Sequence, residues 1–330
     1  MFAAMAAAQK SIYLEMYTFL DDTQATHDFL KLLRVKAAAG LEVVVIADSF
    51  GSSSLRIGAA EALRAAGVEF IFFNHWFHHT HRKILIIDQQ VAFIGGVNIT
   101  ESTRHWIDLQ IRLQGRIVRP LLKSFAYTYQ QVGGEKESIL QYSRLPLAQK
   151  IKSWIVDNLA GTTPRYFINN YYRQKISEAK NSIVIVTPYL LPPSWLVKAL
   201  DDACRRGLRV EILIPNDTDI KPVNKVNYLN ACRLSALGVR FYLLPTMNHA
   251  KIMLIDGEEG VIGSQNMDVL SFNWNIEAGV FFRQKNLVSD LGKIIGQWRK
   301  TAVVFETDGR RINWSDRILI AILKLFYPLF

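Results

Sequence analysis

The sequence predicts an α/β protein with two similar mixed-sheet halves, packed as a pseudo-twofold pair. Two observations predict this fold class. Apolar β-branched runs alternate with helical stretches along the chain, which is typical of α/β folds. The order of these segments also repeats once, and two similar halves pack most simply about a twofold axis.

The composition is that of a globular protein with a basic surface. The chain has 330 residues, of which 50% are hydrophobic and 21% are charged. Its net charge of +10 favours an anionic partner, either nucleic acid or an acidic lipid surface, and charge alone does not distinguish the two. The two cysteines imply no disulfide framework, which fits a reducing compartment.

Four pairs of similar segments define the repeat. They are 10–19 with 181–190, 40–48 with 207–215, 63–73 with 234–244, and 81–88 with 249–256. The last pair is offset by 249 − 81 = 168 residues. In each half a helical stretch ends at a glycine, Gly40 or Gly207, which is a typical helix C-terminal signal.

The repeat also predicts how the chain is divided. The interval 133–164 carries glycines, charges and prolines, and we interpret it as the boundary region. We expect a first repeat over 1–135, a linker over 136–164, a second repeat over 165–308 and an apolar tail over 309–330.

The chain ends bear on membrane association. The N-terminal run lacks the basic start of a signal peptide, and no stretch reaches the roughly 18–20 apolar residues of a membrane span. The segment 317–330 reads RILIAILKLFYPLF and suits a membrane interface. A C-terminal helix docked on the body of the protein is the alternative.

A motif with identical spacing occurs in each half. The first copy comprises His81, Lys83, Asp88, Gly95, Gly96 and Asn98, and the second comprises His249, Lys251, Asp256, Gly263, Ser264 and Asn266. One copy alone would be interpreted as a solvated strand edge, but two copies in register exclude coincidence. Alternate residues of a strand share a face, so each histidine and lysine are expected to project together while apolar neighbours are buried behind them.

The two motifs together suit a phosphodiester. Their lysines and asparagines can hold non-bridging oxygens, one histidine can attack phosphorus, and the other can transfer protons. We expect no metal or other cofactor, because two lysines can supply the charge. Gly96 and Ser264 join the phosphate-binding set because small residues let a ligand approach closely. Asp88 and Asp256 join the catalytic set, with a structural ion pair as the alternative.

The twin pattern HxKx4Dx6G[GS]xN resembles the phospholipase D superfamily over nearly the whole chain. This resemblance implies two α/β halves with an interfacial site and a phosphohistidine mechanism, with His81 as nucleophile and His249 as general acid. The run GSQNMDVLSFNWNIE at 263–277 is similar to the bacterial cardiolipin synthases within that superfamily.

The same resemblance implies an acidic residue that orients each imidazole. Glu277 fits this role for His249, and Asp108 fits it for His81, although the spacings differ by one residue, 277 − 249 = 28 against 108 − 81 = 27. Gly96 stands where the second motif has Ser264, so one hydroxyl contact is expected to be missing in the first half.

Two further segments have alternative interpretations. The histidine-rich run at 74–83 could bind a metal, but no cysteine is near and His81 already belongs to the motif. The run RYFINNYYRQK at 165–175 interleaves aromatic and basic residues, as single-strand nucleic-acid binders do. We favour a strand edge or interface segment there, and do not expect nucleic acid as a partner.

The leading hypothesis is phosphatidyl transfer from one anionic phospholipid, such as phosphatidylglycerol, to the hydroxyl of another, as in cardiolipin synthesis. The alternative is hydrolysis of a phospholipid or nucleic-acid phosphodiester at the same site, with water as acceptor. An inactive binding protein is disfavoured because both motifs are complete. We expect a peripheral membrane protein on the cytoplasmic face of the bacterial inner membrane, and the sequence leaves its oligomeric state open.

Overall fold

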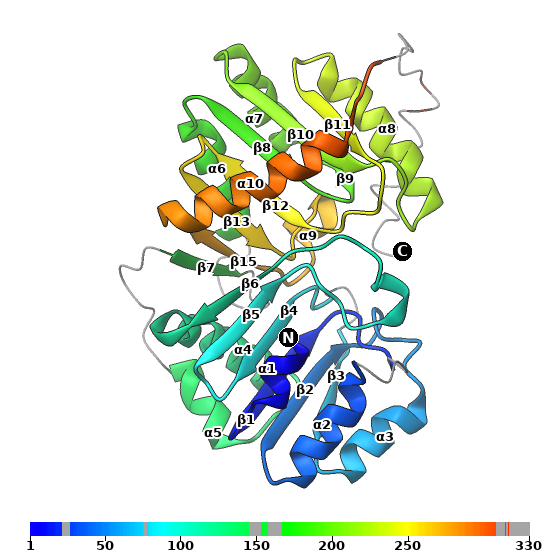
Figure 1. Cartoon of the computed structure of the whole chain (residues 1–330), viewed down its shortest axis with the longest axis vertical. Helices are drawn as coiled ribbons and strands as arrows, with labels where there is room; N and C mark the ends of the chain where they lie inside the picture. Colours follow the sequence, from blue (N-terminus) through cyan, green and yellow to red (C-terminus); the bar gives the residue numbers. More distant parts are fainter. Residues whose placement is uncertain are drawn as a thin grey trace.

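The computed structural model describes residues 1–21, 27–75, 78–144, 153–157, 167–307, 314 and 316. The chain forms two α/β halves, each built on its own mixed sheet, with the N-terminal half below the C-terminal half in Figure 1. This arrangement confirms the predicted fold class.

The first half is a six-stranded sheet in the order β3-β2-β1-β4-β5-β6. Its strands are β1 (Ser11–Met16), β2 (Glu42–Asp48), β3 (Glu69–Phe73), β4 (Lys83–Ile87), β5 (Val91–Gly95) and β6 (Gln110–Gln114). β1, β2 and β3 run parallel, and β4 to β6 continue the sheet as antiparallel hairpins. Helices α1 (Phe2–Ala6), α2 (Phe29–Ala38) and α3 (Ile57–Ala65) pack on the outer face.

The second half is an eight-stranded sheet in the order β16-β11-β10-β8-β12-β13-β15-β7. Its strands are β7 (Ser153–Asp157), β8 (Ser182–Val186), β10 (Arg209–Pro215), β11 (Arg240–Leu244), β12 (Lys251–Ile255), β13 (Glu259–Gly263), β15 (Ala278–Phe282) and β16 (Val303–Val304). Helices α6 (Phe167–Glu178), α7 (Ser194–Arg205) and α8 (Lys221–Ser235) pack on its outer face. A small pair of strands, β9 (Leu190–Leu191) and β14 (Met267–Asp268), precedes the short helix α9 (Val269–Asn273).

The strand orders confirm the internal repeat. The six strands of the first sheet correspond in order to β11, β10, β8, β12, β13 and β15 of the second. Helices α2 and α7 end just before Gly40 and Gly207, whose φ values of +88° and +84° are conformations that L side chains rarely adopt. The predicted glycine stops are therefore confirmed.

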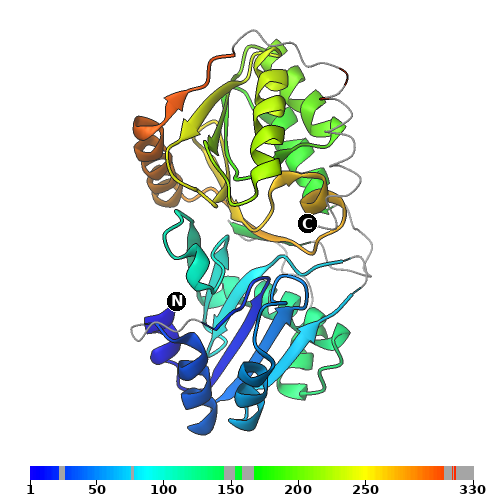
Figure 2. The same cartoon turned by 90° about the vertical axis from the view of Figure 1, so that its right-hand side faces the viewer.

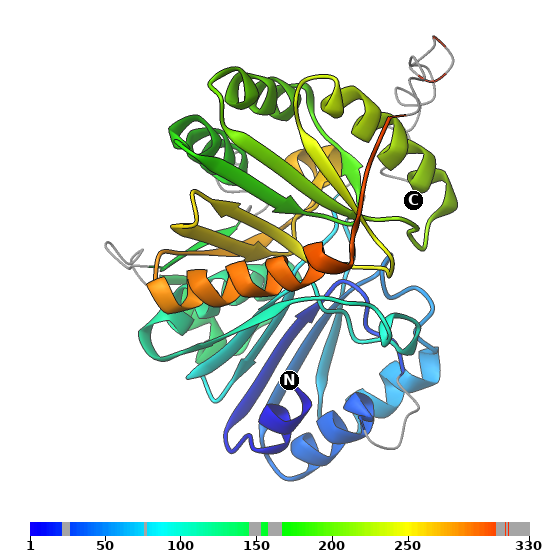
Figure 3. The same ribbon diagram turned by 45° about the horizontal axis from the view of Figure 1, so that its top comes forward.

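The two halves share a core. Helices α4 (Val118–Gln131) and α10 (Lys285–Thr301) pack in the largest apolar cluster, which joins buried residues of both sheets. Figure 3 shows α10 crossing the junction between the halves. Ile84 and Ile86 enter this core from β4, as Ile252 and Leu254 do from β12. Each buried aliphatic side chain contributes about 1.5–3 kcal/mol, so this shared core holds the halves together.

The interval 136–164 contains elements that pack with different halves. The short helix α5 (Glu137–Leu140) contacts α4, whereas β7 pairs with β15 at the edge of the second sheet. The segment 165–175 was expected to be a strand edge or an interface segment, and the strand edge was wrong, because residues from Phe167 on form α6. Ile168, Tyr172 and Ile176 are spaced by four and are fully buried, which is the apolar stripe of a helix.

Apart from Trp314 and Asp316, the expected apolar tail at 309–330 lies outside the described residues. Among the residues that the structure describes, no helix has both the length and the apolarity needed to cross a membrane.

Candidate active site

The two motif histidines lie where short extended segments of the two halves pair with each other. An isolated parallel bridge joins Thr80 to Ile276, and the His81 N–H donates to the Ile276 carbonyl at 2.9 Å. A matching bridge joins Ile107 to Asn248, and the His249 N–H donates to the Ile107 carbonyl at 2.6 Å. Figure 2 shows the gold segment around α9, which leads to Ile276, at this junction.

Each histidine is held by an acid from the opposite half. Nδ1 of His81 lies 3.0 Å from Oε1 of Glu277, and Nδ1 of His249 lies 2.8 Å from Oδ2 of Asp108. The prediction paired each acid with the histidine of its own half, and that pairing is wrong. The bridges explain why: each acid follows a segment that has crossed to the other half, so it reaches the other histidine.

These contacts define the tautomer of both imidazoles. A carboxylate only accepts hydrogen bonds, so the proton lies on Nδ1 of each ring and Nε2 presents its lone pair. Both residues are nearly buried, with 7% of His81 and 4% of His249 exposed. Burial and the charges of Lys83 and Lys251 lower the pKa of His81, although Glu277 opposes them. Burial and Lys251 likewise lower the pKa of His249 to about 3. Both rings are therefore neutral near pH 7.

The motif lysines are buried beside the histidines. Nζ of Lys83 donates to the His81 carbonyl at 2.7 Å, and Nζ of Lys251 donates to the His249 carbonyl. Burial lowers the pKa of Lys83 well below its ordinary value and that of Lys251 to about 8. The carboxylates of Asp108 and Glu277 oppose this effect in both cases. Two buried lysines, each influenced by both carboxylates, form a site that can accept an anion.

Glu277 is the centre of a hydrogen-bond network. The hydroxyls of Ser264 and Ser271 both donate to its carboxylate, which is fully buried. Burial alone would raise the pKa of Glu277, but the charge and hydrogen bond of His81 and the charge of Lys83 lower it. Ser264 was predicted to bind phosphate. Its hydroxyl holds the acid that orients His81, and a phosphate contact by Ser264 stays a prediction.

The other orienting acid explains why position 96 is a glycine. A Cβ atom built on Gly96 would overlap with the carboxylate of Asp108. The residue at this position must therefore be small because the acid passes over it, and the close approach of a ligand to Gly96 stays a prediction. Ser264 and Gly96 thus occupy equivalent positions beside the two orienting acids.

The motif asparagines differ from each other in their contacts. Asn266 is 5% exposed, and its Oδ1 has no hydrogen-bond partner among the described residues. Oδ1 of Asn98 accepts the N–H of Thr18 at 3.3 Å. Of the two, Asn266 is the one whose buried amide oxygen the described protein leaves unsatisfied, which suits a ligand contact.

Asp88 and Asp256 lie at the other edge of the sheets. The Asp88 carboxylate accepts backbone N–H groups of residues 9–11, which lead into β1. Asp256 accepts the equivalent N–H groups of residues 180–182, before β8. β4 and β12 separate these aspartates from the histidines by roughly 20 Å at the usual rise of a strand. The structure therefore contradicts the prediction that they are catalytic.

Several residues near the histidines were not predicted. The Tyr17 ring lies 4.7 Å from the His81 ring, and Nζ of Lys83 lies 4.9 Å from the Tyr17 ring. The rings of Trp106 and Tyr189 lie 5.3 Å and 6.1 Å from that of His249. Tyr17 and Tyr189 follow the carboxyl ends of β1 and β8, and ligand sites of α/β sheets lie at such ends. The position of Tyr17 and Tyr189 just after predicted strands could therefore have identified them as candidate site residues.

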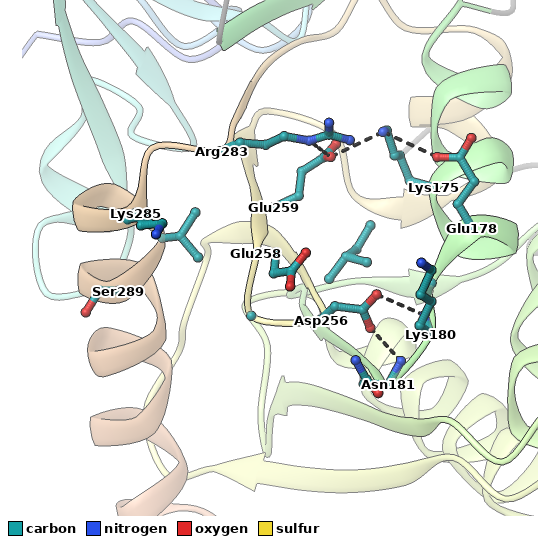
Figure 4. A pocket seen from close by; sticks show the side chains of 14 residues that line it. Lys175, Glu178, Lys180, Asn181, Asp256, Glu258, Glu259, Arg283, Lys285 and Ser289 are labelled. Atoms are coloured by element: carbon teal, nitrogen blue, oxygen red, sulfur yellow. Dashed lines mark hydrogen bonds and ion pairs between the residues drawn. The ribbon is translucent and has the colours of Figure 1, made fainter.

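A pocket on the second half has neither motif histidine among its lining residues, which Figure 4 draws. It includes Asp256, which follows β12, whereas His249 precedes this strand. Glu259 within it is bound by Lys175 at 3.2 Å and by Arg283 at 2.5 Å. Its central charges are thus already paired within the protein, so the candidate active site remains the one between the halves.

The fold and site define a protein of the phospholipase D type: two α/β repeats that bring two histidine–lysine pairs together. The chain belongs to the family described as "Cardiolipin synthase, PLD-like domain", whose sequence model matches residues 1–152 and 172–298. The resemblance expected from the twin motif is therefore confirmed.

Individual relatives agree with this assignment. The chain is 30% identical over 348 residues to the cardiolipin synthase of Halalkalibacterium halodurans, covering 99% of this chain and 69% of that protein. It is 30% identical over 303 residues to cardiolipin synthase 1 of Staphylococcus epidermidis, covering 86% of this chain and 62% of that protein. The chain thus spans about two thirds of the length of these relatives.

A solved structure shares the fold. The phosphatidylserine synthase of Haemophilus influenzae superposes with a TM-score of 0.73 at 16% sequence identity, covering 99% of this chain and 90% of that one. The polyphosphate kinase of Porphyromonas gingivalis superposes with a TM-score of 0.63 at 14% identity, covering 99% of this chain and 51% of that one. At these identities the likeness concerns the fold alone.

Proposed function

We propose that this chain is a phosphatidyltransferase of the cardiolipin synthase kind, which moves a phosphatidyl group from one anionic phospholipid to a hydroxyl of another. The observation that carries the proposal is the pair of neutral imidazoles, each held by an acid from the opposite half beside a buried lysine. Relatives named as cardiolipin synthases support phospholipid as the substrate.

In the first step, Nε2 of His81 attacks the donor phosphorus and displaces the headgroup alcohol. His249 gives its Nε2 proton to the leaving oxygen. Burial and Lys251 keep the free His249 neutral, but a bound phosphodiester anion opposes the lysine charge and favours the protonated ring this step needs. We assign His81 as the nucleophile because its acid, Glu277, is also held by two hydroxyls.

In the second step, neutral His249 takes the proton of the acceptor hydroxyl, whose oxygen attacks the phosphohistidine. The bond from phosphorus to His81 breaks, and the free enzyme is restored. Lys83, Lys251 and the Nδ2 amide of Asn266 would donate to the non-bridging oxygens through both steps and stabilise the additional negative charge of the transition state. These charged and neutral donors supply the electrostatic role for which a metal is used elsewhere.

We also propose that the protein acts at a membrane surface. The net charge of +10 favours anionic lipid, and the segment 317–330 is apolar. Phe50 and Trp274 are 42% and 44% exposed, and their rings lie 5.0 Å and 6.2 Å from those of His79 and His78. Exposed aromatic rings close to the site suit contact with lipid. Flotation with phosphatidylglycerol vesicles, before and after removal of 317–330, tests this proposal.

The finer location that we propose is the cytoplasmic face of the bacterial inner membrane. The relatives are bacterial, and both cysteines of the chain are free, which fits a reducing compartment. Accessibility to a protease added to intact spheroplasts would distinguish the two faces.

The proposed function is tested by product analysis with phosphatidylglycerol vesicles in EDTA, beside a His81→Ala variant. Cardiolipin and glycerol, absent with the variant, are the expected products. Phosphatidic acid alone would show a hydrolase with the same chemistry. Wild-type protein that is folded and yields no lipid product would overturn the proposal and direct attention to nucleic-acid phosphodiesters.

A further inference from the structure

His79 continues the line of active-site residues along the segment that enters β4. Thr80 and Arg82 both turn toward Glu15, to which the Thr80 hydroxyl and the Arg82 guanidinium donate. In an extended chain the alternate residues face the other way, so His79 shares the face of the catalytic histidine. The Tyr17 ring confirms this, because it lies 6.5 Å from the His79 ring and 4.7 Å from the His81 ring.

A buried carboxylate fixes the orientation of His79. Its Nδ1 lies 3.2 Å from Oδ1 of Asp48, which is fully buried at the end of β2. The same carboxylate accepts the N–H groups of Phe50, Gly51 and Thr80. Because the Asp48 oxygens act as acceptors for these donors, Nδ1 of His79 carries the shared proton, and in the neutral ring Nε2 presents a lone pair.

The lone pair of His79 is available. Within the part of the chain that the structure describes, Nε2 has no hydrogen-bond partner, and 22% of the side chain is exposed. The motif lysines and the amide nitrogen of Asn266 offer N–H donors, whereas His79, like Oδ1 of Asn266, offers an acceptor in addition to the two motif histidines. A phosphate oxygen cannot donate to it, but a hydroxyl can.

The feature occurs in one half only. The repeat offset of 168 places Met247 at the position that corresponds to His79, because 79 + 168 = 247. The Met247 side chain has no hydrogen-bond donor, and its thioether sulfur is a weak acceptor. The two ends of the pseudo-symmetric site therefore differ in their ability to bind an alcohol, as suits an enzyme that holds one lipid as donor and another as acceptor.

We propose that His79 is a specificity residue that binds a hydroxyl of the acceptor lipid and so favours transfer over hydrolysis. This inference rests on the proposed function. A glycerol headgroup has a second hydroxyl besides the attacking one, and His79 would accept its proton in a hydrogen bond. That contact positions the headgroup beside the phosphohistidine. Water can also donate to His79, but it has no second hydroxyl, so a water held there is not thereby positioned beside the phosphohistidine.

The test is the ratio of cardiolipin to phosphatidic acid made from phosphatidylglycerol vesicles. His79→Met, which copies the other half, is expected to lower this ratio about tenfold while total donor cleavage stays within about threefold. His79→Gln keeps an acceptor oxygen and is expected to recover part of the ratio. His27→Ala, which changes an exposed histidine against the Phe2 ring, is the matched control.

An unchanged ratio in His79→Met would overturn the inference, whether total cleavage is normal or reduced. A wild-type protein without lipid products contradicts the proposed function first. The inference is then decided by titrating glycerophosphoglycerol, the deacylated headgroup, while following the imidazole ¹⁵N signals of His79. A shift of the Nε2 signal supports alcohol binding, and an unmoved signal overturns it.

Discussion

His81 and Glu277 are 196 positions apart in the chain and lie in opposite halves, yet Nδ1 of the histidine is 3.0 Å from the carboxylate. The relationship is reciprocal, since Asp108 of the first half holds His249 of the second at 2.8 Å. Neither half therefore contains a complete histidine–acid pair of its own. The site exists only when the halves are packed together, and their shared core makes that packing stable.

The crossed pairing predicts which histidine responds to each acid. Glu277→Gln is expected to move the imidazole ¹⁵N signals of His81 and to leave those of His249 in place, because only His81 loses its carboxylate. Asp108→Asn should do the reverse. Each variant is the control for the other. Turnover should fall about 10²- to 10⁴-fold in both, because the wrong tautomer becomes populated.

Signals can be assigned with His81→Gln and His249→Gln. If Glu277→Gln moved the signals of His249 and spared those of His81, the pairing would lie within the halves and the crossed arrangement would be incorrect.

Gly96 is predicted to tolerate no side chain. The methyl group of Gly96→Ala would overlap with the Asp108 carboxylate and push it away from His249. We expect a loss of turnover of about 10²-fold or more and a lower melting temperature. Gly292→Ala in α10 is the control, since nothing lies within 4 Å of its added Cβ. A helical alanine there should stabilise the protein by about 0.5–1 kcal/mol. Normal turnover in Gly96→Ala would refute this account of the glycine.

Asp88 and Asp256 are predicted to matter for stability and not for turnover. Asp88→Ala or Asp256→Ala removes a carboxylate that accepts three successive backbone N–H groups. We expect a loss of about 1–3 kcal/mol in the free energy of unfolding, with turnover within about threefold of wild type. Urea denaturation and lipid assays measure the two quantities. Asp202→Ala, at an exposed ion pair on α7, is the control. A 10³-fold loss of turnover from a folded Asp88→Ala variant would restore a catalytic role.

Lys251 is predicted to oppose folding. Its pKa is lowered from 10.5 to about 8 in the folded protein, mainly by burial. Between these two values the unfolded chain binds more protons than the folded one, so stability rises with pH across this window. Below pH 8 the cost is fully present and amounts to at most about 3 kcal/mol. Lys251→Met should therefore raise the stability at pH 7 and flatten the rise between pH 8 and 10.5.

Urea denaturation at several pH values measures the difference between wild type and Lys251→Met. Lys198→Met is the control, because Lys198 is an exposed lysine on α7. Identical pH profiles for wild type and Lys251→Met would show that the burial of this ammonium has no such cost.

The fold was predictable because the sequence contains the same order of segments in two copies. Alternating apolar runs and glycine stops gave the elements, and the repeat gave the two halves. The spacing of His81 to Lys83 and of His249 to Lys251 identified the paired side chains. The structure places each pair on one face of the chain where β4 or β12 begins. The helix α6 was missed because its stripe of Ile168, Tyr172 and Ile176 is interleaved with basic and polar residues.

The contacts across the interface were not predictable from spacing. Similar intervals from His81 to Asp108 and from His249 to Glu277 suggested pairs within each half. Two short β-bridges between the halves instead bring each acid to the histidine of the opposite half. A motif pattern also does not distinguish a residue that binds substrate from one that supports a neighbour. The motif includes Ser264, Gly96 and Asp88, and for each of them a neighbouring protein group accounts for the residue type at that position.

The central claim is that the chain transfers a phosphatidyl group through His81, and trapping the covalent intermediate tests it most directly. Wild-type protein is mixed with phosphatidylglycerol labelled at phosphorus, quenched in base to preserve phosphohistidine, and digested for peptide mass analysis. The account predicts label on the peptide that carries His81, absent in His81→Ala. Active protein that carries no label on any histidine would contradict it.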